Sequence, residues 1–125
     1  MTSPLRIGVI GLGTVGAALV STLQKNKNFI ATRAGRPLVV VAVSARDKTK
    51  DRGFDHKDLH WFDDPVTLAK SSDIDCLVEL IGGADGTAKA AVETALASGK
   101  SVVTANKALL AKHGRALVEI GRAHV

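Results

Sequence analysis

A cluster of glycines near the start of the chain has the residue types and the spacing of a phosphate-binding turn. Gly11, Gly13 and Gly16 form a G-x-G-x-x-G pattern that stands between the apolar run Leu5 to Ile10 and a stretch with helical spacing. In this setting the first glycine allows the tight turn, the second lets a diphosphate approach the backbone, and the third lets helix and strand pack closely. Free N–H groups at the start of the helix then attract the phosphates. The predicted contacts with a dinucleotide are Gly11, Leu12, Gly13, Thr14, Val15 and Gly16.

The end of the second apolar run bears on which dinucleotide is bound. NAD-preferring domains usually place a carboxylate after this strand to bind the ribose hydroxyls. This chain has Ser44-Ala45-Arg46-Asp47 after the run Leu38 to Val43. Arg46 suits the 2′-phosphate of NADP, which favours NADP, whereas Asp47 leaves NAD open and a solvated loop charge is the alternative for Arg46. The glycine pattern is also compatible with FAD, with S-adenosylmethionine, or with a turn that binds no ligand.

Other kinds of chemistry lack the residues that they need. The single cysteine, Cys76, excludes an internal disulfide, and its apolar surroundings favour a buried hydrophobe over a nucleophile. The histidines show no metal-ligand spacing and are expected on the surface or in loops; they are His56, His60, His113 and His124. The formal charge is +5, but the basic residues form no stripe with aromatic platforms, so no nucleic acid partner is expected. Because no apolar run reaches membrane-spanning length and no signal-peptide pattern opens the chain, we expect a cytoplasmic protein without a membrane partner.

The elements that must position these residues alternate along the chain. Apolar runs bounded by glycines and turns predict strands at residues 5–10, 38–43, 59–62, 74–81 and 101–104. Helical spacing and caps, Asp64 among them, predict helices at residues 14–24, 26–34, 64–71, 87–97 and 107–120. Strands that alternate with helices predict an α/β fold, a Rossmann-type doubly wound parallel sheet with helices on both faces.

Three segments together are more specific than the glycine pattern alone. They are Ile10 to Gly16, Glu79-Leu80-Ile81-Gly82-Gly83, and Thr104-Ala105-Asn106-Lys107-Ala108-Leu109-Leu110-Ala111. With Ala34 to Pro37 and the Asp63-Asp64-Pro65 turn, they resemble the N-terminal half of homoserine dehydrogenase over residues 5 to 118. The resemblance implies an NAD(P)-dependent oxidoreductase that interconverts L-homoserine and L-aspartate 4-semialdehyde, on the route to threonine, isoleucine and methionine.

The same resemblance implies roles for residues beyond the glycine pattern. Gly82 and Gly83 are expected to line the nicotinamide end of the cleft, and Thr104 and Lys107 to contact the cofactor. A lysine that opens a helix is disfavoured by the helix dipole, which favours a functional Lys107 over a solvated one. Its ammonium suits ribose or phosphate oxygens or a developing alkoxide, so Lys107 is the catalytic residue that we expect in this chain. Asn106 is expected to cap the same helix, and Glu79 to be a buried strand-end group with a hydrogen-bonded partner and no catalytic role.

The chain also departs from the family pattern. The family's second domain carries the substrate-binding residues, the lysine that donates a proton and most of the dimer interface, and none of this domain matches here. We expect residues 1–118 to form a partial NAD(P)-binding domain, incomplete at its C-terminus, that is inactive alone because hydride transfer needs both reactants held together. The substrates and a homo-oligomer are expected only for the full-length protein. Residues 119–125 are expected to be a non-native tail, because their codons can be written as the start of a common sequencing adapter.

Two further functions stay open beside this interpretation. One is a stand-alone NAD(P)-binding sensor domain, which uses the same glycine pattern without a substrate domain. The second is a different NAD(P) oxidoreductase that shares this half. The paired segments at residues 79–83 and 104–111 argue against a different oxidoreductase.

Overall fold

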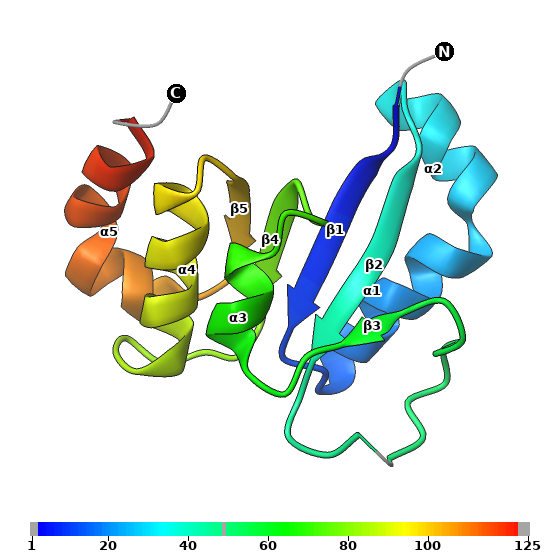
Figure 1. Cartoon of the computed structure of the whole chain (residues 1–125), viewed down its shortest axis with the longest axis horizontal. Helices are drawn as coiled ribbons and strands as arrows, with labels where there is room; N and C mark the ends of the chain where they lie inside the picture. Colours follow the sequence, from blue (N-terminus) through cyan, green and yellow to red (C-terminus); the bar gives the residue numbers. More distant parts are fainter. Residues whose placement is uncertain (1–2, 49, 123–125) are drawn as a thin grey trace.

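The structure, a computed structural model, describes residues 3–48 and 50–122 and is built around a parallel sheet. Within these residues the sheet has five strands in the order β3-β2-β1-β4-β5 (Figure 1). The strands are β1 (Leu5–Ile10), β2 (Leu38–Ser44), β3 (His60–Trp61), β4 (Cys76–Glu79) and β5 (Ser101–Thr104). The chain leaves the edge strand β3 and returns as β4 on the far side of β1, so the strand order switches direction next to β1. The predicted α/β fold with a parallel sheet is confirmed.

The central strands are aliphatic because both of their faces are covered. All residues of β4 and the last residues of β1 are buried, as expected for strands with helices on both sides. Ile10 at the end of β1 pairs with Ser44 on one side and with Glu79 on the other. This register brings the turn after β1 between the ends of β2 and β4.

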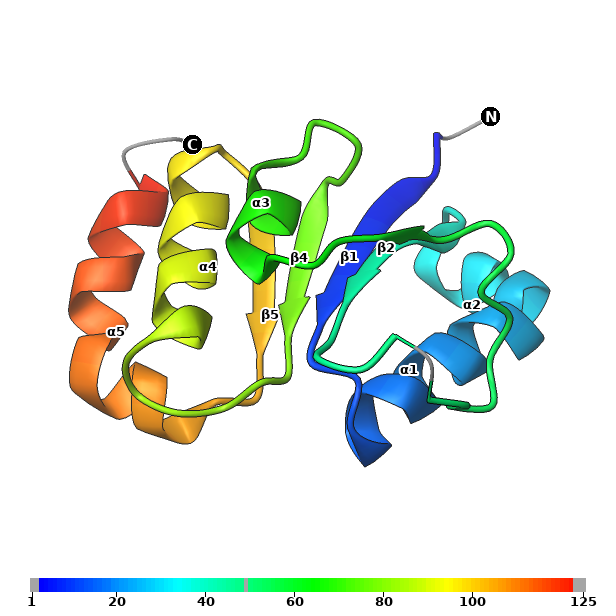
Figure 2. The same cartoon turned by 60° about the horizontal axis from the view of Figure 1, so that its bottom comes forward.

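Helices cover both faces of the sheet, as Figure 2 shows. Helices α1 (Thr14–Lys25) and α2 (Lys27–Ala34) lie on one face, where Val20 and Leu23 pack with Val9 and Val43. The other face carries α3 (Pro65–Lys70), α4 (Thr87–Ala97) and α5 (Lys107–Arg122). The small side chains of α4 let it approach the sheet closely, and α5 packs into the same apolar cluster through Leu109 and Leu117.

Strand β4 is shorter than the strand predicted at residues 74–81, and side chains bind the backbone at both of its ends. Before the strand, the Asp75 carboxylate accepts hydrogen bonds from the backbone and the guanidinium of Arg6. After the strand, the Glu79 carboxylate accepts the N–H groups of Ile81 and Gly82. After the strand these N–H groups are therefore not available to the ladder, whereas the Asp75 N–H still donates to the carbonyl oxygen of Arg6.

The remaining differences from the predicted elements are small and lie at their ends. Strand β2 includes Ser44, β3 is shorter than residues 59–62, and α1 continues to Lys25. Residues 119–122, which belong to the expected tail, continue α5. Residues 123–125 lie outside the described part of the chain.

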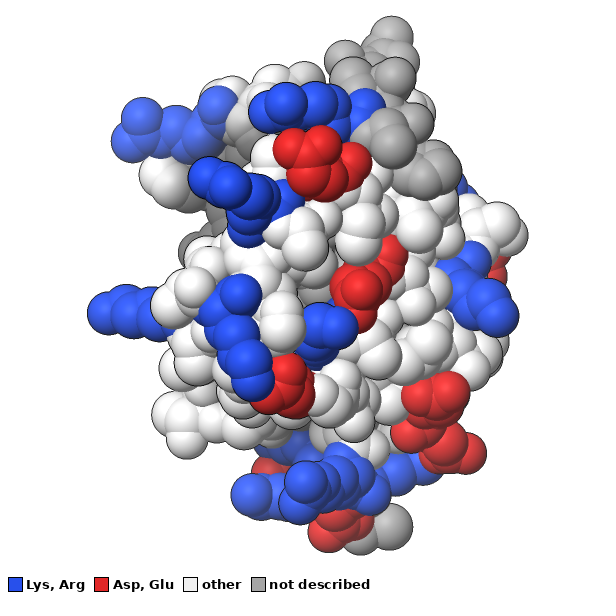
Figure 3. Space-filling view, turned by 90° about the vertical axis from the view of Figure 1, so that its left-hand side faces the viewer, with Lys and Arg blue, Asp and Glu red and all other residues white. Residues whose placement is uncertain are grey.

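The surface on the α5 side of the molecule carries charges of both signs. Figure 3 shows Lys and Arg side chains there with Asp and Glu between them. One such contact joins Lys112 of α5 to Asp85, at 2.7 Å between Nζ and Oδ2. Within the described residues, no helix combines the length and the apolarity that crossing a bilayer requires.

Candidate dinucleotide-binding site

Two glycines at the junction of β1 and α1 are required by the packing of the protein itself. Gly11 has φ +90°, and a Cβ there would lie 2.6 Å from the carbonyl carbon of Leu80. A Cβ on Gly16 would lie 2.0 Å from the carbonyl oxygen of Gly11. Real Cβ atoms do not approach backbone atoms this closely, so the tight turn predicted at Gly11 and the close helix packing predicted at Gly16 are confirmed.

The middle glycine of the turn faces open space instead. Among the described residues, no atom beyond its chain neighbours lies within 4 Å of a Cβ built on Gly13, and its φ of −72° is one that any residue adopts. Gly13 is the N-cap of α1, where no side chain caps the helix and the first turn holds no acidic residue. The first N–H groups of α1 therefore carry the partial positive charge of a helix start without a capping side chain. This is the space and the charge that a diphosphate requires.

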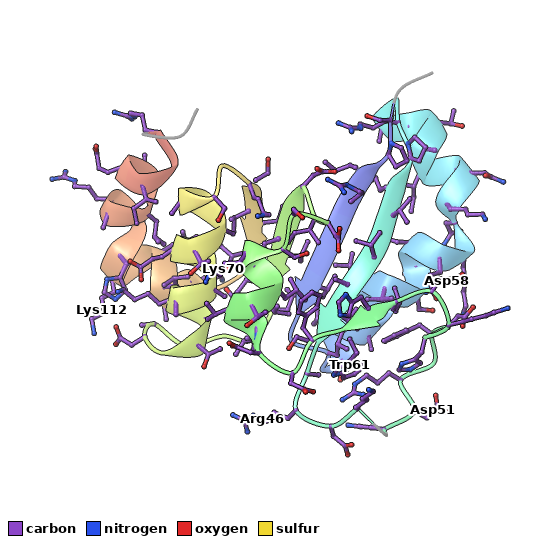
Figure 4. All side chains as sticks on the ribbon, in the orientation of Figure 1. Arg46, Asp51, Asp58, Trp61, Lys70 and Lys112 are labelled. Carbon is purple, nitrogen blue, oxygen red and sulfur yellow. The ribbon has the colours of Figure 1, made fainter. Side chains whose placement is uncertain are left out.

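A cleft of about 680 Å³ joins this turn to the end of β2 and to the loop after β4. It opens where the strands end, which is where open α/β sheets bind ligands. Figure 4 shows Arg46 on the loop beyond the end of β2. The lining residues are Gly11, Leu12, Gly13, Ser44, Ala45, Arg46, Asp47, Lys50, Arg52, Asp63, Pro65, Leu80, Ile81 and Thr87.

One wall of the cleft, formed by the loop after β2, carries three basic side chains beside one carboxylate, and this basic wall includes a residue that no sequence pattern singled out. Arg46 and Lys50 line it together with Arg52. The Arg52 Nε donates to the carbonyl oxygen of Leu12 at 3.1 Å, and its guanidinium carbon lies 5.4 Å from the centre of the Trp61 ring. Arg52 therefore fastens the loop after β2 to the glycine turn. The basic loop was visible in the sequence, but no local pattern says which of its cations turns towards the glycines.

The Ser44 hydroxyl is an independent sign that the cleft takes a polar ligand. Ser44 is only 1% exposed, and within the described residues its Oγ has no hydrogen-bond partner. Buried hydroxyls nearly always have one, because an unpaired buried polar group costs free energy. Ser44 lines the cleft, and its carbonyl oxygen accepts the N–H of Gly11 at 3.0 Å. The open cradle at Gly13, the basic wall and this hydroxyl fit a phosphorylated ribonucleotide.

Buried polar side chains join the ends of β4 and β5 beside this cleft. Glu79 is fully buried, and its Oε2 accepts the N–H groups of Ile81 at 2.8 Å and Gly82 at 2.9 Å. Its Oε1 accepts the hydroxyl of Thr104, the residue that pairs with it across the two strands. The prediction that Glu79 is a buried strand-end group with a hydrogen-bonded partner is confirmed.

Asn106 extends this network to the start of α5. Its side-chain oxygen accepts the N–H of Leu109 at 3.0 Å, so the predicted cap is confirmed. Its amide nitrogen donates to the carbonyl oxygen of Gly83 at 2.6 Å, and its own N–H donates to Thr104 Oγ1 at 3.0 Å. Lys107 follows as the first residue of α5 and is exposed.

The predicted site residues fall into two neighbouring groups. Gly11, Leu12, Gly13 and Arg46 share the cleft, while Thr14, Val15 and Gly16 form the first turn of α1 next to it. The second group follows the ends of β4 and β5 and does not line the cleft; its members are Gly82, Gly83, Thr104 and Lys107. Both groups lie at the carboxyl edge of the sheet, because parallel strands end on the same side.

The other titratable groups have structural surroundings. Burial raises the pKa of the Cys76 thiol, which suits the predicted buried hydrophobe and disfavours a thiolate. Hydrogen bonds from Lys112 and His113 lower the pKa of Asp85 and tie the loop after β4 to α5. His60 lies exposed on β3, as expected for a surface residue, and stacks on Phe62, whereas His113 is half-buried in α5 beside Asp85. His124 lies outside the described residues, among which no cluster of His, Cys, Asp and Glu has the arrangement of a metal site.

Comparisons with known proteins agree with this geometry. A family model described as the NAD-binding domain of homoserine dehydrogenase matches residues 11–125. The homoserine dehydrogenase of Methylobacillus glycogenes is 40% identical over 108 residues, which cover 86% of this chain and 26% of that protein. The Pseudomonas aeruginosa homoserine dehydrogenase is 42% identical over 113 residues, or 89% of this chain and 25% of that protein.

A solved structure shows the same relationship. The crystal structure of a homoserine dehydrogenase from Thiobacillus denitrificans superposes with a TM-score of 0.85 and 37% identity, over 97% of this chain and 28% of that chain. The chain thus spans about a quarter of the length of the curated relatives that it matches. With its parallel sheet, its glycine turn and the match over residues 11–125, the chain belongs to the homoserine dehydrogenase family and corresponds to its NAD-binding domain.

Proposed function

We propose that the chain binds NADP(H) along the carboxyl edge of the sheet. In this arrangement the diphosphate lies against Gly13 and the first N–H groups of α1. The adenosine 2′-phosphate lies by the basic wall that Arg46 and Lys50 line, and the nicotinamide lies towards Gly82. The observation that carries the proposal is that one cleft of about 680 Å³ joins the open cradle at Gly13 to Arg46.

We further propose that the whole protein to which this domain belongs interconverts L-homoserine and L-aspartate 4-semialdehyde. This step belongs to threonine, methionine and isoleucine biosynthesis, and we place it in the cytoplasm with a homo-oligomeric enzyme. The nicotinamide, when bound, donates or accepts the hydride. The exposed ammonium of Lys107 stands at the nicotinamide end, where it binds cofactor oxygens or stabilises the alkoxide that develops on the substrate.

Titration of the folded 125-residue chain with NADPH and NADH tests the binding proposal. We expect wild type to prefer NADPH, because a guanidinium binds a phosphate through charge-assisted hydrogen bonds. Arg46→Asp should weaken NADPH binding at least about tenfold, the loss that removing one such bond causes. NADH binding should be kept or improved, because a carboxylate at this position suits ribose hydroxyls.

Arg115→Asp provides the matched control, because it makes the same charge change on the exposed surface of α5. It should leave both affinities unchanged. Equal NADPH affinity in wild type and Arg46→Asp would remove Arg46 from the site. A wild-type preference for NADH would replace NADP by NAD in the proposal. Failure of the folded chain to bind either dinucleotide at millimolar concentration would refute the binding proposal altogether.

A further inference from the structure

The Glu79 carboxylate is fully buried at the end of β4, in a setting that normally excludes charge. A buried carboxylate is tolerated only where hydrogen bonds replace its lost hydration. Glu79 has such bonds, and their donors are the N–H groups of Ile81 and Gly82 and the hydroxyl of Thr104. Two of these donors are backbone groups of the residues that leave the sheet. The carboxylate therefore determines the path of the chain as it leaves β4.

The same network continues to the opposite side of this loop. The Asn106 amide donates to the carbonyl oxygen of Gly83, and the Asn106 N–H donates to Thr104. An unbroken series of hydrogen bonds thus runs from Gly82 through Glu79, Thr104 and Asn106 back to Gly83. Gly82 and Gly83 have φ of +91° and +88°, a region that glycine enters freely, so two adjacent glycines leave this loop many other conformations unless hydrogen bonds hold it.

This network lies where the second half of a dinucleotide has to be. In a doubly wound sheet the diphosphate sits at the first helix and the ligand crosses the switch in strand order. The basic wall follows β2, on one side of β1, which assigns that side to the phosphorylated adenosine. The other half of the ligand then extends over the ends of β4 and β5, where Glu79 holds the loop.

We propose that Glu79 is a positioning residue for the nicotinamide half of the cofactor, which acts by holding the Gly82–Gly83 loop through Thr104 and Asn106. The inference rests on the proposed NADP(H) binding. Glu79 does not touch the ligand; it determines where the backbone of Gly82 and Gly83 stands and how the start of α5 is aligned with it.

The isosteric change Glu79→Gln isolates this role. A glutamine oxygen still accepts the two backbone N–H groups, so the volume and part of the network are kept. Its NH₂ group then faces the Thr104 hydroxyl, which already accepts the N–H of Asn106 and loses its own acceptor. The link between the ends of β4 and β5 is therefore weakened while the core packing is kept.

The test compares two ligands that differ only in the nicotinamide: NADPH and 2′-phospho-ADP-ribose. In calorimetric titrations of the full chain, Glu79→Gln should bind NADPH about tenfold more weakly than wild type does. Its affinity for 2′-phospho-ADP-ribose should stay within about twofold of the wild-type value. Glu93→Gln makes the same chemical change in a partly exposed pair with Lys89 on α4 and should alter neither affinity. A purely structural defect would weaken both ligands equally.

A second variant and a measurement on wild type cover the case in which Glu79→Gln fails to fold. Asn106→Asp keeps the oxygen that caps α5 but removes the donor to Gly83, and it should show the same selective loss of NADPH affinity. In wild type, the amide protons of Ile81 and Gly82 should exchange slowly because both are donated to Glu79.

Each result decides the matter. Selective loss of NADPH affinity with protected Ile81 and Gly82 amides supports the inference. The inference is overturned, while NADP(H) binding stands, if the affinities for both ligands fall equally or if neither falls. Fast exchange of these two amide protons overturns it as well. If the folded wild-type chain binds neither ligand, the proposed function fails, and the role of Glu79 fails with it.

Discussion

The glycines at the junction of β1 and α1 are needed for different physical reasons. At Gly16 a side chain would collide with the backbone oxygen of Gly11, and the backbone has no flexible end that can move aside. At Gly13 a Cβ would meet no atom of the part of the chain that the structure describes. The protein itself therefore requires glycine at residue 16, whereas at residue 13 the requirement comes from the proposed diphosphate.

Alanine substitutions should separate these two requirements. Gly16→Ala should lower the free energy of unfolding by about 2 kcal/mol or more, because the new Cβ forces the helix away from the turn. Gly13→Ala should change it by less than about 1 kcal/mol, because φ is already negative and the space is open. The same variant should bind NADPH at least about tenfold more weakly than wild type, because the methyl group occupies the place of the diphosphate. Urea unfolding and calorimetric titration measure the two effects.

Gly114→Ala is the control for both variants, since this glycine lies in α5 and a Cβ there meets nothing within 4 Å outside its own helix among residues 3–48 and 50–122. It should stabilise the chain slightly, as alanine does in helices, and leave NADPH affinity unchanged. Wild-type affinity in Gly13→Ala would mean that no phosphate approaches this residue.

Helix α3 shows how a short element depends on its cap. It has six residues, too few for a stable helix in isolation. Asp64 accepts the N–H of Val66 and the hydroxyl of Thr67, both at 3.0 Å, and Pro65 occupies the first helical position. The helix places the buried Leu68 against the sheet.

Removing this cap should be measurable in the stability of the whole domain. Asp64→Ala should lower the free energy of unfolding by about 1 kcal/mol, because Val66 and Thr67 lose their acceptor. Asp64→Ser should restore most of the loss, because serine also caps helices. Asp58→Ala, on the exposed loop before β3 (Figure 4), should change stability by less than about 0.5 kcal/mol. Similar losses in the Asp64 and Asp58 alanine variants would show that the cap contributes nothing.

At the scale of the whole molecule, an ion pair joins β1 to the segment that enters β4. The Asp75 carboxylate accepts the backbone N–H of Arg6 at 2.9 Å and its guanidinium at 2.9 and 3.1 Å. These hydrogen bonds lower the pKa of Asp75 from 3.8 to about 2. The side chains of Arg6 and Asp75 are 43% and 35% exposed, so solvent screens the ion pair and its effect on stability is modest.

The depressed pKa of Asp75 determines how this contribution depends on pH. A carboxyl group whose pKa is lower in the folded state stabilises the fold at pH values above its ordinary pKa. This stabilisation is lost as the pH falls from the ordinary pKa to the pKa in the folded state. The melting temperature of wild type should therefore decrease between pH 3.8 and about pH 2. Asp75→Asn should have a lower melting temperature than wild type at neutral pH, and its melting temperature should fall less over this pH interval. Asp58→Asn should follow the wild-type curve, and identical slopes for all three proteins would exclude the pair as a cause.

Much of the fold and part of the site could be predicted from local patterns in the sequence. Three kinds of signal act on neighbours within a few residues: the apolar runs, the helical spacing, and the capping residues Asp64 and Asn106. They can therefore be recognised without the tertiary structure. The glycine turn belongs to the same class, because a strand before it and a helix after it are enough to define its geometry. The family resemblance added the segments around Gly82 and Lys107.

What the tertiary structure alone decided concerns residues that meet through space. Arg52 reaches Leu12 across 40 residues, and Glu79 binds Thr104 across 25 because the register of β4 and β5 places them opposite each other. The Ser44 hydroxyl, which has no partner among the described residues, likewise depends on what the neighbouring strand and loop present to it. Secondary structure follows from short-range periodicity and conformational preference, whereas these contacts follow from strand order and register, which no local segment contains.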